Sequence, residues 1–276
     1  MDLILGDPRG GWHPVRLIGN AISALERSLR KRDLDGRKGG VCLVLLVQCL
    51  FLTAYLVVVW MLYQINHVVG LAFNLLLVYL FLAVKDLAVH VHPVSHALKA
   101  GDMEEARKRV AFIVGRDPNY LDSTGICRAA VESVAENFVD GILSPVFWFA
   151  AGGLLGHVIG ASPVTWAVAF MLIFKIASTL DSMVGYKDET YAAFGWAGAR
   201  LDDAMNYIPA RLGIGVLFFG AWVTGMDARR GLIIARRDRL KHESPNSAHA
   251  ESFFAGALGV RLGGPTRYPN GLKEKE

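Results

Sequence analysis

Charged residues are missing from long stretches of this 276-residue chain. No Asp, Glu, Lys or Arg occurs in 41–84, 141–174, 176–180 or 212–226. Stretches of this length and polarity are typical of membrane-spanning segments. Because 53% of the residues are hydrophobic and 20% are charged, a disordered chain is excluded. The sequence therefore predicts a polytopic membrane protein with sizeable water-facing segments.

Other common signals are also missing. The three cysteines have no metal-ligand spacing and suggest no disulfide framework. The first residues lack the basic region of a cleaved signal peptide. The net charge is +4, but no basic run is interleaved with aromatic residues, so nucleic acid is not an expected partner. No Walker P-loop, GxSxG or HExxH motif is present.

The pattern of apolar runs predicts an all-α polytopic fold, with 1–276 forming a single integral-membrane domain. We expect two transmembrane helical hairpins and a short fifth hydrophobic segment, with cytoplasmic helical segments forming the active site. In chain order these are an N-terminal motif with an amphipathic helix (1–40), the first hairpin (41–84), a cytoplasmic helical segment (85–140), the second hairpin (141–180), a cytoplasmic motif (181–211), the fifth segment (212–226) and a cytoplasmic tail (227–276).

The fifth segment is too short for a standard span. The apolar part, 212–225, has 14 residues, whereas a typical spanning stretch has about 20. The tail behind it begins with a cluster of arginines, which the positive-inside rule keeps in the cytoplasm. We therefore expect a re-entrant or interfacial segment, with every polar segment on one side of the membrane.

A stripe of ionisable residues follows the helical repeat before the second hairpin. Arg128, Glu132, Glu136 and Asp140 are four residues apart, so they share one helix face, and Asn137 adds a polar group beside it. A solvated face with ion pairs is one reading. The other is a ligand or metal site, because carboxylates at a membrane edge are costly unless they face a cation, water or a pocket.

Lys175 is the one charge within the second apolar block. It either snorkels to the membrane edge or points into a pocket as a functional cation. Asp181 and Lys187 follow directly at that edge.

The run RLDDAMNYIPARL contains a possible oxygen-ligand set. Asp202, Asp203 and Asn206 are spaced i, i+1, i+4, which brings two carboxylates and an amide together on a helix. Such ligands suit Mg²⁺ that bridges phosphates. Acids on an ordinary helix surface are the alternative.

Two further polar motifs lie near the chain ends. In HESPNSAHAE, Ser244 and Pro245 are a good N-cap and first-turn pair for a helix whose free N–H groups favour anions, and Asn246, Ser247, His249 and Glu251 follow. Near the N-terminus, Asp7, His13 and Arg16 lie among turn-forming glycines and prolines.

These segments strongly resemble the CobD/CbiB family of cobalamin biosynthesis, the membrane-bound adenosylcobinamide-phosphate synthases. The resemblance spans nearly the whole chain, with the first hydrophobic block the least tied to it. The matching runs are GDPRGGWHPVRLIG (6–19), VGRDPNYLDSTGICRAAVESVAENFVDGILSPVFW (114–148), KIASTLDSMVGYKDETYAAFGWAGARLDDAMNYIPAR (175–211) and SPNSAHAESFFAGALGVRLGG (244–264).

The resemblance implies an ATP-dependent amide ligase of the cytoplasmic (inner) membrane, with its active site facing the cytoplasm. It would join adenosylcobyric acid to (R)-1-aminopropan-2-ol phosphate to give adenosylcobinamide phosphate, and whether ethanolamine phosphate is used instead is left open. ATP and Mg²⁺ are the implied cofactors, and the lipid bilayer and other cobamide-assembly enzymes are the implied partners. The order of the catalytic steps and the oligomeric state are left open.

The motif residues receive roles on the same basis. The catalytic set is Glu132, Glu136, Lys175 and His249, of which Glu132, Glu136 or His249 would be the base. The substrate and phosphate set is Asp7, His13, Arg16, Arg128, Asn137, Asp140, Lys187, Arg211, Ser244, Asn246, Ser247 and Glu251. The metal set is Asp181, Asp202, Asp203 and Asn206.

Two other classes of protein compete with the ligase. A small-molecule transporter would also bury Lys175, but it would show hydropathy repeats with binding groups at mid-membrane. A non-catalytic membrane sensor or accessory protein would not need every dense polar motif. The polar motifs lie in water-facing segments at the ends of the spans, which favours an enzyme.

Overall fold

The computed structural model describes residues 13–114, 117–268 and 271–275. The chain divides into two compact units, each built from two stretches of sequence. Unit 1 consists of Met1–Ala83 with Ser144–Asn206, and unit 2 consists of Val84–Leu143 with Tyr207–Glu276.

The described residues are mostly helical. The first half contains α2 (Pro14–Arg30), α3 (Arg37–Ile65), α4 (His67–Phe81), α5 (Val84–Lys99), α6 (Met103–Val110), the 3₁₀ turn η1 (Pro118–Tyr120), α7 (Ser123–Phe138) and the π-helix η2 (Val139–Leu143). The second half contains α8 (Ser144–Val158), α9 (Pro163–Val184), α10 (Trp196–Val223), α11 (Ala228–Asp238), α12 (Ser247–Leu258) and the antiparallel strands β1 (Gly264–Tyr268) and β2 (Gly271–Lys275).

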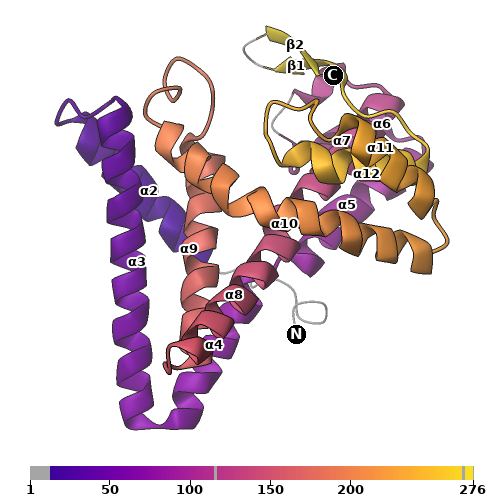
Figure 1. Ribbon diagram of the computed structural model, residues 1–276. Coiled ribbons are helices and arrows are strands. Elements are labelled where there is room, and N and C mark those ends of the chain that lie inside the picture. Colours follow the sequence, from indigo (N-terminus) through magenta and orange to yellow (C-terminus); the bar gives the residue numbers. More distant parts are fainter. Residues whose placement is uncertain (1–12, 115–116, 269–270, 276) are drawn as a thin grey trace. The chain divides into compact units, whose positions relative to one another are not determined.

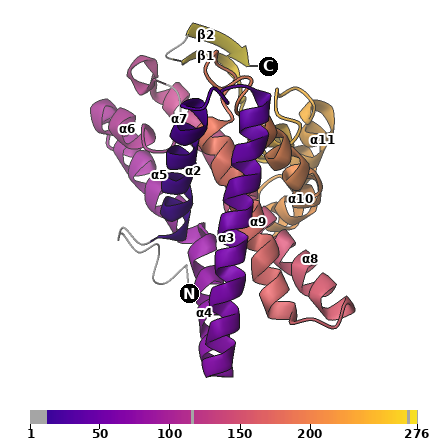
Figure 2. The ribbon, with the colours of Figure 1, turned by 90° about the vertical axis from the view of Figure 1, so that its left-hand side faces the viewer.

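Unit 1 contains both expected hairpins (Figure 1). Helices α3 and α4 are joined at Asn66, whose side chain accepts a hydrogen bond from the Val68 N–H at 2.7 Å and so caps α4. Helices α8 and α9 pack closely because glycines face the partner helix. A Cβ on Gly152 would lie only 2.4 Å from the Trp166 carbonyl oxygen. Amphipathic α2 lies beside α3, with Ile18 and Ile22 fully buried (Figure 2).

The polytopic all-α fold is confirmed. Within the described residues, four helical stretches are long and apolar enough to cross a membrane: Arg37–Ile65, Ser123–Val158, Pro163–Val184 and Trp196–Val223. Helix α4 is shorter than the expected span, because extended Leu82 ends it after 15 residues. The fifth hydrophobic segment is not a separate element, since it continues α10 past Pro209.

A buried polar network ties the two hairpins of unit 1 together. The Tyr55 hydroxyl lies 2.6 Å from Asn74 Oδ1 and 3.0 Å from the Thr165 carbonyl oxygen. The Asn74 amide also donates to the Gly70 carbonyl at 2.8 Å. Because an unsatisfied polar group in an apolar interior is costly, these bonds fix how α3, α4 and α9 meet.

Unit 2 is a cluster of helices with a C-terminal β-hairpin. Its helix α7 passes directly into the π-helix η2, and this changes one expectation. The wider turn of a π-helix breaks the four-residue register at Phe138. Asp140, which lies in η2, is therefore not simply the next step of the stripe on α7.

Candidate functional site

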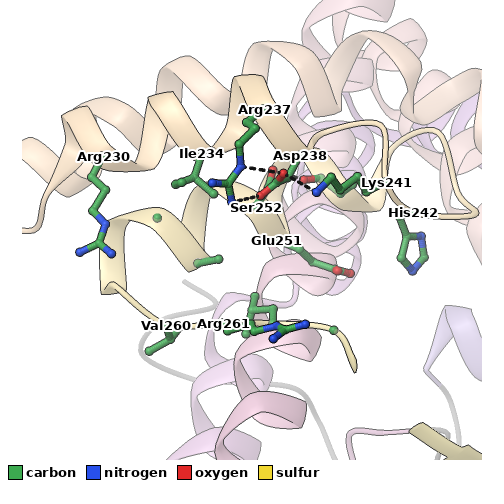
Figure 3. Close-up of a pocket in the computed structure, with 15 residues that line it drawn as sticks. Arg230, Ile234, Arg237, Asp238, Lys241, His242, Glu251, Ser252, Val260 and Arg261 are labelled. Carbon is green, nitrogen blue, oxygen red and sulfur yellow. Dashed lines mark hydrogen bonds and ion pairs between the residues drawn. The ribbon is translucent and has the colours of Figure 1, made fainter. Parts of the chain in front are cut away.

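A cavity of about 500 Å³ in unit 2 lies between α11, α12 and the segment 260–263. This is the size of a typical small-molecule site. Figure 3 shows Glu251 and Arg261 extending toward the same open space. The lining residues are Arg230, Ile234, Arg237, Asp238, Lys241, His242, Ala248, Glu251, Ser252, Ala255, Gly256, Val260, Arg261, Leu262 and Gly263.

Helix α11 separates its basic residues between two faces. It packs on α12 through small residues: Ala228, Gly231 and Ala235 are buried. Arg230 and Arg237, seven residues apart, share the cavity face. Their neighbours Arg229 and Arg236 are exposed and do not line the cavity.

The cavity is cationic overall. Four of its side chains are basic (Arg230, Arg237, Lys241 and Arg261) and two are acidic. One of the acids, Asp238, is held by Arg237 at 2.7 and 3.0 Å and by Lys241 at 3.0 Å. The hydrogen bond from Arg237 is the main cause that lowers the pKa of Asp238 to about 2, with Lys241 acting in the same direction. Anionic ligands, phosphates above all, suit such a lining.

The start of α12 differs from the sequence prediction. Ser244 was expected to be the N-cap, but the helix begins at Ser247 and its N-cap is Asn246. The Ser244 hydroxyl instead accepts a hydrogen bond from the Asn246 N–H within a turn, at 3.3 Å. The Asn246 side chain makes no capping bond and accepts one from Arg211 of α10 at 3.4 Å. The prediction was wrong because Ser244 lies in a turn before the helix, where its hydroxyl is bonded to the Asn246 N–H.

His249, in the first turn of α12, is 1% exposed. Burial is the main cause that lowers the pKa of its ring, and the positive charges of Arg211 and Arg239 lower it further, while the Asn246 carbonyl opposes them. The ring is therefore neutral at pH 7. Arg211 and Arg239 supply positive charge at this helix start, and His249 does not.

The stripe residues on α7 differ in their surroundings. Arg128 donates to the Gly263 carbonyl oxygen at 2.6 Å, and Glu132 Oε1 accepts from the Gly263 N–H at 2.9 Å. Glu132 is 5% exposed, so it is not part of a solvated face. Glu136 is exposed one turn later. Asn137 donates to the Ser133 carbonyl oxygen at 2.9 Å.

In unit 1, three of the expected metal ligands lie close together on α10. The Asn206 amide donates to Asp202 at 3.0 Å, and its oxygen accepts from the Ser144 hydroxyl at 2.5 Å. Asp202 and Asn206 are buried, whereas Asp203 is partly exposed and lies 3.9 Å from Arg200.

The donors on α10 fit Mg²⁺ in part. Among the residues that the structure describes, no group of three or more His, Cys, Asp or Glu side chains is arranged to hold a metal ion. Mg²⁺, however, is commonly held by one or two carboxylates together with substrate phosphates and waters, which Asp202 and Asp203 suit. Asn206 uses both ends of its amide within the protein, so it fits as a residue that orients Asp202.

The remaining predicted residues are more scattered. His13 caps α2 by accepting from the Val15 N–H at 3.3 Å, and its Nε2 lies 3.1 Å from the Leu80 carbonyl oxygen. Arg16 is exposed, and Asp7 lies outside the described residues. In unit 1, Lys175 and Asp181 of α9 are partly buried, and Lys187 is exposed beyond its end.

Sequence reasoning missed the basic residues of the cavity, namely Arg230, Arg237, Lys241 and Arg261. The run ARRGLIIARRD was interpreted only as charge that sets membrane orientation. Its arginine pairs repeat at a spacing of seven, which places one member of each pair on one helix face. That spacing could have indicated a basic binding surface.

Fold and site together define a class: helical integral-membrane proteins with a cationic cavity in a unit rich in helices. The chain belongs to the CobD/CbiB family, because the model of the CobD/Cbib protein family matches residues 1–276. It therefore takes part in cobalamin biosynthesis.

Curated relatives agree with this placement, and each is named cobalamin biosynthesis protein CobD. The protein of Pelobacter propionicus is 45% identical over all of this chain and 81% of its own length. That of Clostridium perfringens is 39% identical over all of this chain and 83% of its own length. That of Citrobacter koseri is 41% identical over 97% of this chain and 81% of its own length. No solved structure matches the chain.

Proposed function

We propose that the protein is an ATP-dependent amide ligase, an adenosylcobinamide-phosphate synthase. It would join the free carboxyl group of adenosylcobyric acid to the amine of (R)-1-aminopropan-2-ol phosphate. The observation that carries the proposal is the cationic cavity of unit 2, whose four basic side chains suit a phosphate-bearing substrate. Both ATP and the amino-alcohol phosphate have this chemistry.

The reaction needs activation of a carboxylate, which is a poor acyl donor. ATP would supply it, because a phosphorylated carboxyl group loses phosphate when an amine attacks. Arg230, Arg237 and Arg261 would bind phosphate oxygens and offset the charge that develops on them. Arg211 of α10, which donates to Asn246 beside the start of α12, would bind a further anion together with N–H groups of the first turn of α12.

Two further roles complete the proposal. Asp202 and Asp203 would hold Mg²⁺, which would neutralise phosphate charge. The substrate ammonium must lose a proton before it attacks. In unit 2, exposed Glu136 and neutral His249 are the two candidates for accepting that proton. Lys175 and Lys187 of unit 1 would be additional phosphate ligands.

The test is an assay of the purified full-length protein with adenosylcobyric acid, ATP and each amino-alcohol phosphate in turn. We expect amide formation that depends on ATP and Mg²⁺, with the aminopropanol phosphate or the ethanolamine phosphate as amine. An absence of product with both amines, from folded protein in lipid, would contradict the proposal and favour an accessory role in the pathway.

We also propose that the protein lies in the cytoplasmic membrane with its polar segments facing the cytoplasm, where other cobamide-assembly enzymes would exchange substrates with it. The arginines of 229–239 support this orientation. In a variant with Cys42, Cys49 and Cys127 changed to serine, an impermeant thiol reagent outside intact cells should label Asn66→Cys and Ala161→Cys. Labelling of Leu240→Cys, which is 74% exposed, would contradict this orientation.

A further inference from the structure

Two side chains of α7 bind the segment between α12 and β1 at a single residue, Gly263. The Gly263 carbonyl oxygen accepts from Arg128 at 2.6 Å, and the Gly263 N–H donates to Glu132 at 2.9 Å. The two side chains are one turn apart on α7, so they point in the same direction. Hydrogen bonds with an ionised partner are stronger than neutral ones, and here one of them is buried.

The segment needs such a hold because its backbone is unusual. Gly263 and Gly264 have φ angles of +77° and +93°, a region that side chains other than hydrogen rarely allow. A Cβ on Gly264 would also lie 3.0 Å from Arg128 Nη1. Glycine is the most flexible residue in the unfolded chain, so fixing two in a row is entropically costly. The bonds from α7 offset this cost.

The held segment forms one wall of the cavity. Val260, Arg261, Leu262 and Gly263 all line it, and Arg261 is one of its four basic residues. Arg261 lies two residues from the held glycine. A loose segment would let this guanidinium leave the cavity, whereas a fixed Gly263 keeps it in place.

We propose that Arg128 and Glu132 are positioning residues that act through Gly263 to keep Arg261 at the cavity. Neither touches the substrate, and Glu132 is not the base of the reaction. The proposal rests on the proposed function in one respect, namely that the cavity binds a phosphate-bearing substrate. The hold itself is a property of unit 2 and can be measured without any substrate.

Two substitutions at Glu132 separate positioning from catalysis. Glu132→Gln keeps an acceptor oxygen for the Gly263 N–H but removes the basicity. As a positioning residue, the glutamine variant should keep turnover within about 3-fold of wild type with an unchanged pH profile, while Glu132→Ala should raise the KM for a phosphate-bearing substrate about 10-fold or more and change kcat less. A base would instead lose about 100-fold or more in both variants, which would overturn the proposal.

Hydrogen exchange of the full-length protein in lipid gives a second measurement that needs no activity. Glu132→Ala should speed exchange of the Gly263 amide and its neighbours in 260–264, and Glu132→Gln should restore most of the protection. Glu104→Ala, an exposed acid on α6 of the same unit, is the control and should leave this segment unchanged.

Hydrogen exchange and kinetics together distinguish three outcomes. Unchanged exchange at 260–264 in Glu132→Ala would overturn the claim that Glu132 fixes this segment, whatever the activity assay shows. Faster exchange in a protein whose wild type forms no amide would support the hold and contradict only the proposed function. Faster exchange with an unchanged KM in an active enzyme would overturn the claim that a fixed Gly263 keeps Arg261 at the cavity.

Discussion

Replacing Arg230 and Arg237 together by glutamine is expected to raise the KM for a phosphate-bearing substrate by about 100-fold, since the charge-assisted hydrogen bonds that both guanidinium groups would give to phosphate are lost. Both arginines line the cavity of unit 2. The loss of Arg237 also leaves Asp238 paired with Lys241, so negative charge increases where an anion must bind. Steady-state kinetics with ATP and with the amino-alcohol phosphate, varied separately, show which substrate uses the cavity.

The chain supplies a matched control for this variant. Arg229 and Arg236 precede the two cavity arginines on the same helix and are exposed outside the cavity. Changing both to glutamine removes the same charge from the same helix, so the long-range attraction of an anionic substrate to the protein weakens equally. We expect a KM within about 3-fold of wild type, because these two side chains do not line the cavity. Equal losses in the two double variants would mean that overall charge, and not the cavity, binds the substrate.

Much of the fold could be predicted because it depends on local composition. The charge-free runs 41–84 and 141–174 predict the two hairpins, and the apolar spacing at Ile18 and Ile22 predicts the buried face of α2. The π-helix Val139–Leu143 could not be predicted in this way, because a change in hydrogen-bond register leaves no mark in composition. The continuity of α10 across Pro209 is similar, since a proline normally ends or kinks a helix.

The site was harder to predict because its contacts are distant in sequence. The stripe on α7 was found by its spacing, but the partner of Glu132 is 131 residues away, so its burial against Gly263 has no local signal. The contact between Arg211 of α10 and Asn246, the N-cap of α12, spans 35 residues and likewise has no local signal. The cavity arginines had a signal in their seven-residue spacing. This spacing alone does not predict a cavity, because basic residues near apolar segments are also explained by membrane orientation.

The second large effect is expected at the acids of α10. Asp202→Asn and Asp203→Asn should each lower turnover about 1000-fold and raise the Mg²⁺ concentration needed for half-maximal rate, since each variant would lose a carboxylate that would hold Mg²⁺ and so the charge that Mg²⁺ would supply to the transition state. Asparagine is chosen because its oxygen still accepts the hydrogen bond that Asn206 gives to Asp202, at 3.0 Å in the wild type. Folding is therefore expected to persist. Binding of Mn²⁺, followed by electron paramagnetic resonance, measures the same site without turnover.

Two further variants serve as comparisons for Mn²⁺ binding. Asp227→Asn removes one carboxylate from the N-cap of α11, where asparagine caps as well as aspartate, and should leave Mn²⁺ affinity unchanged. Asn206→Ala tests the orienting role, because Asp202 would lose its amide donor and Ser144 its acceptor. We expect weaker Mn²⁺ binding there than in wild type, but tighter than in Asp202→Asn, since both carboxylates are retained. Wild-type Mn²⁺ affinity in both aspartate variants would exclude this pair as metal ligands, and the buried Asp202–Asn206–Ser144 network would then serve to join α10 to α8.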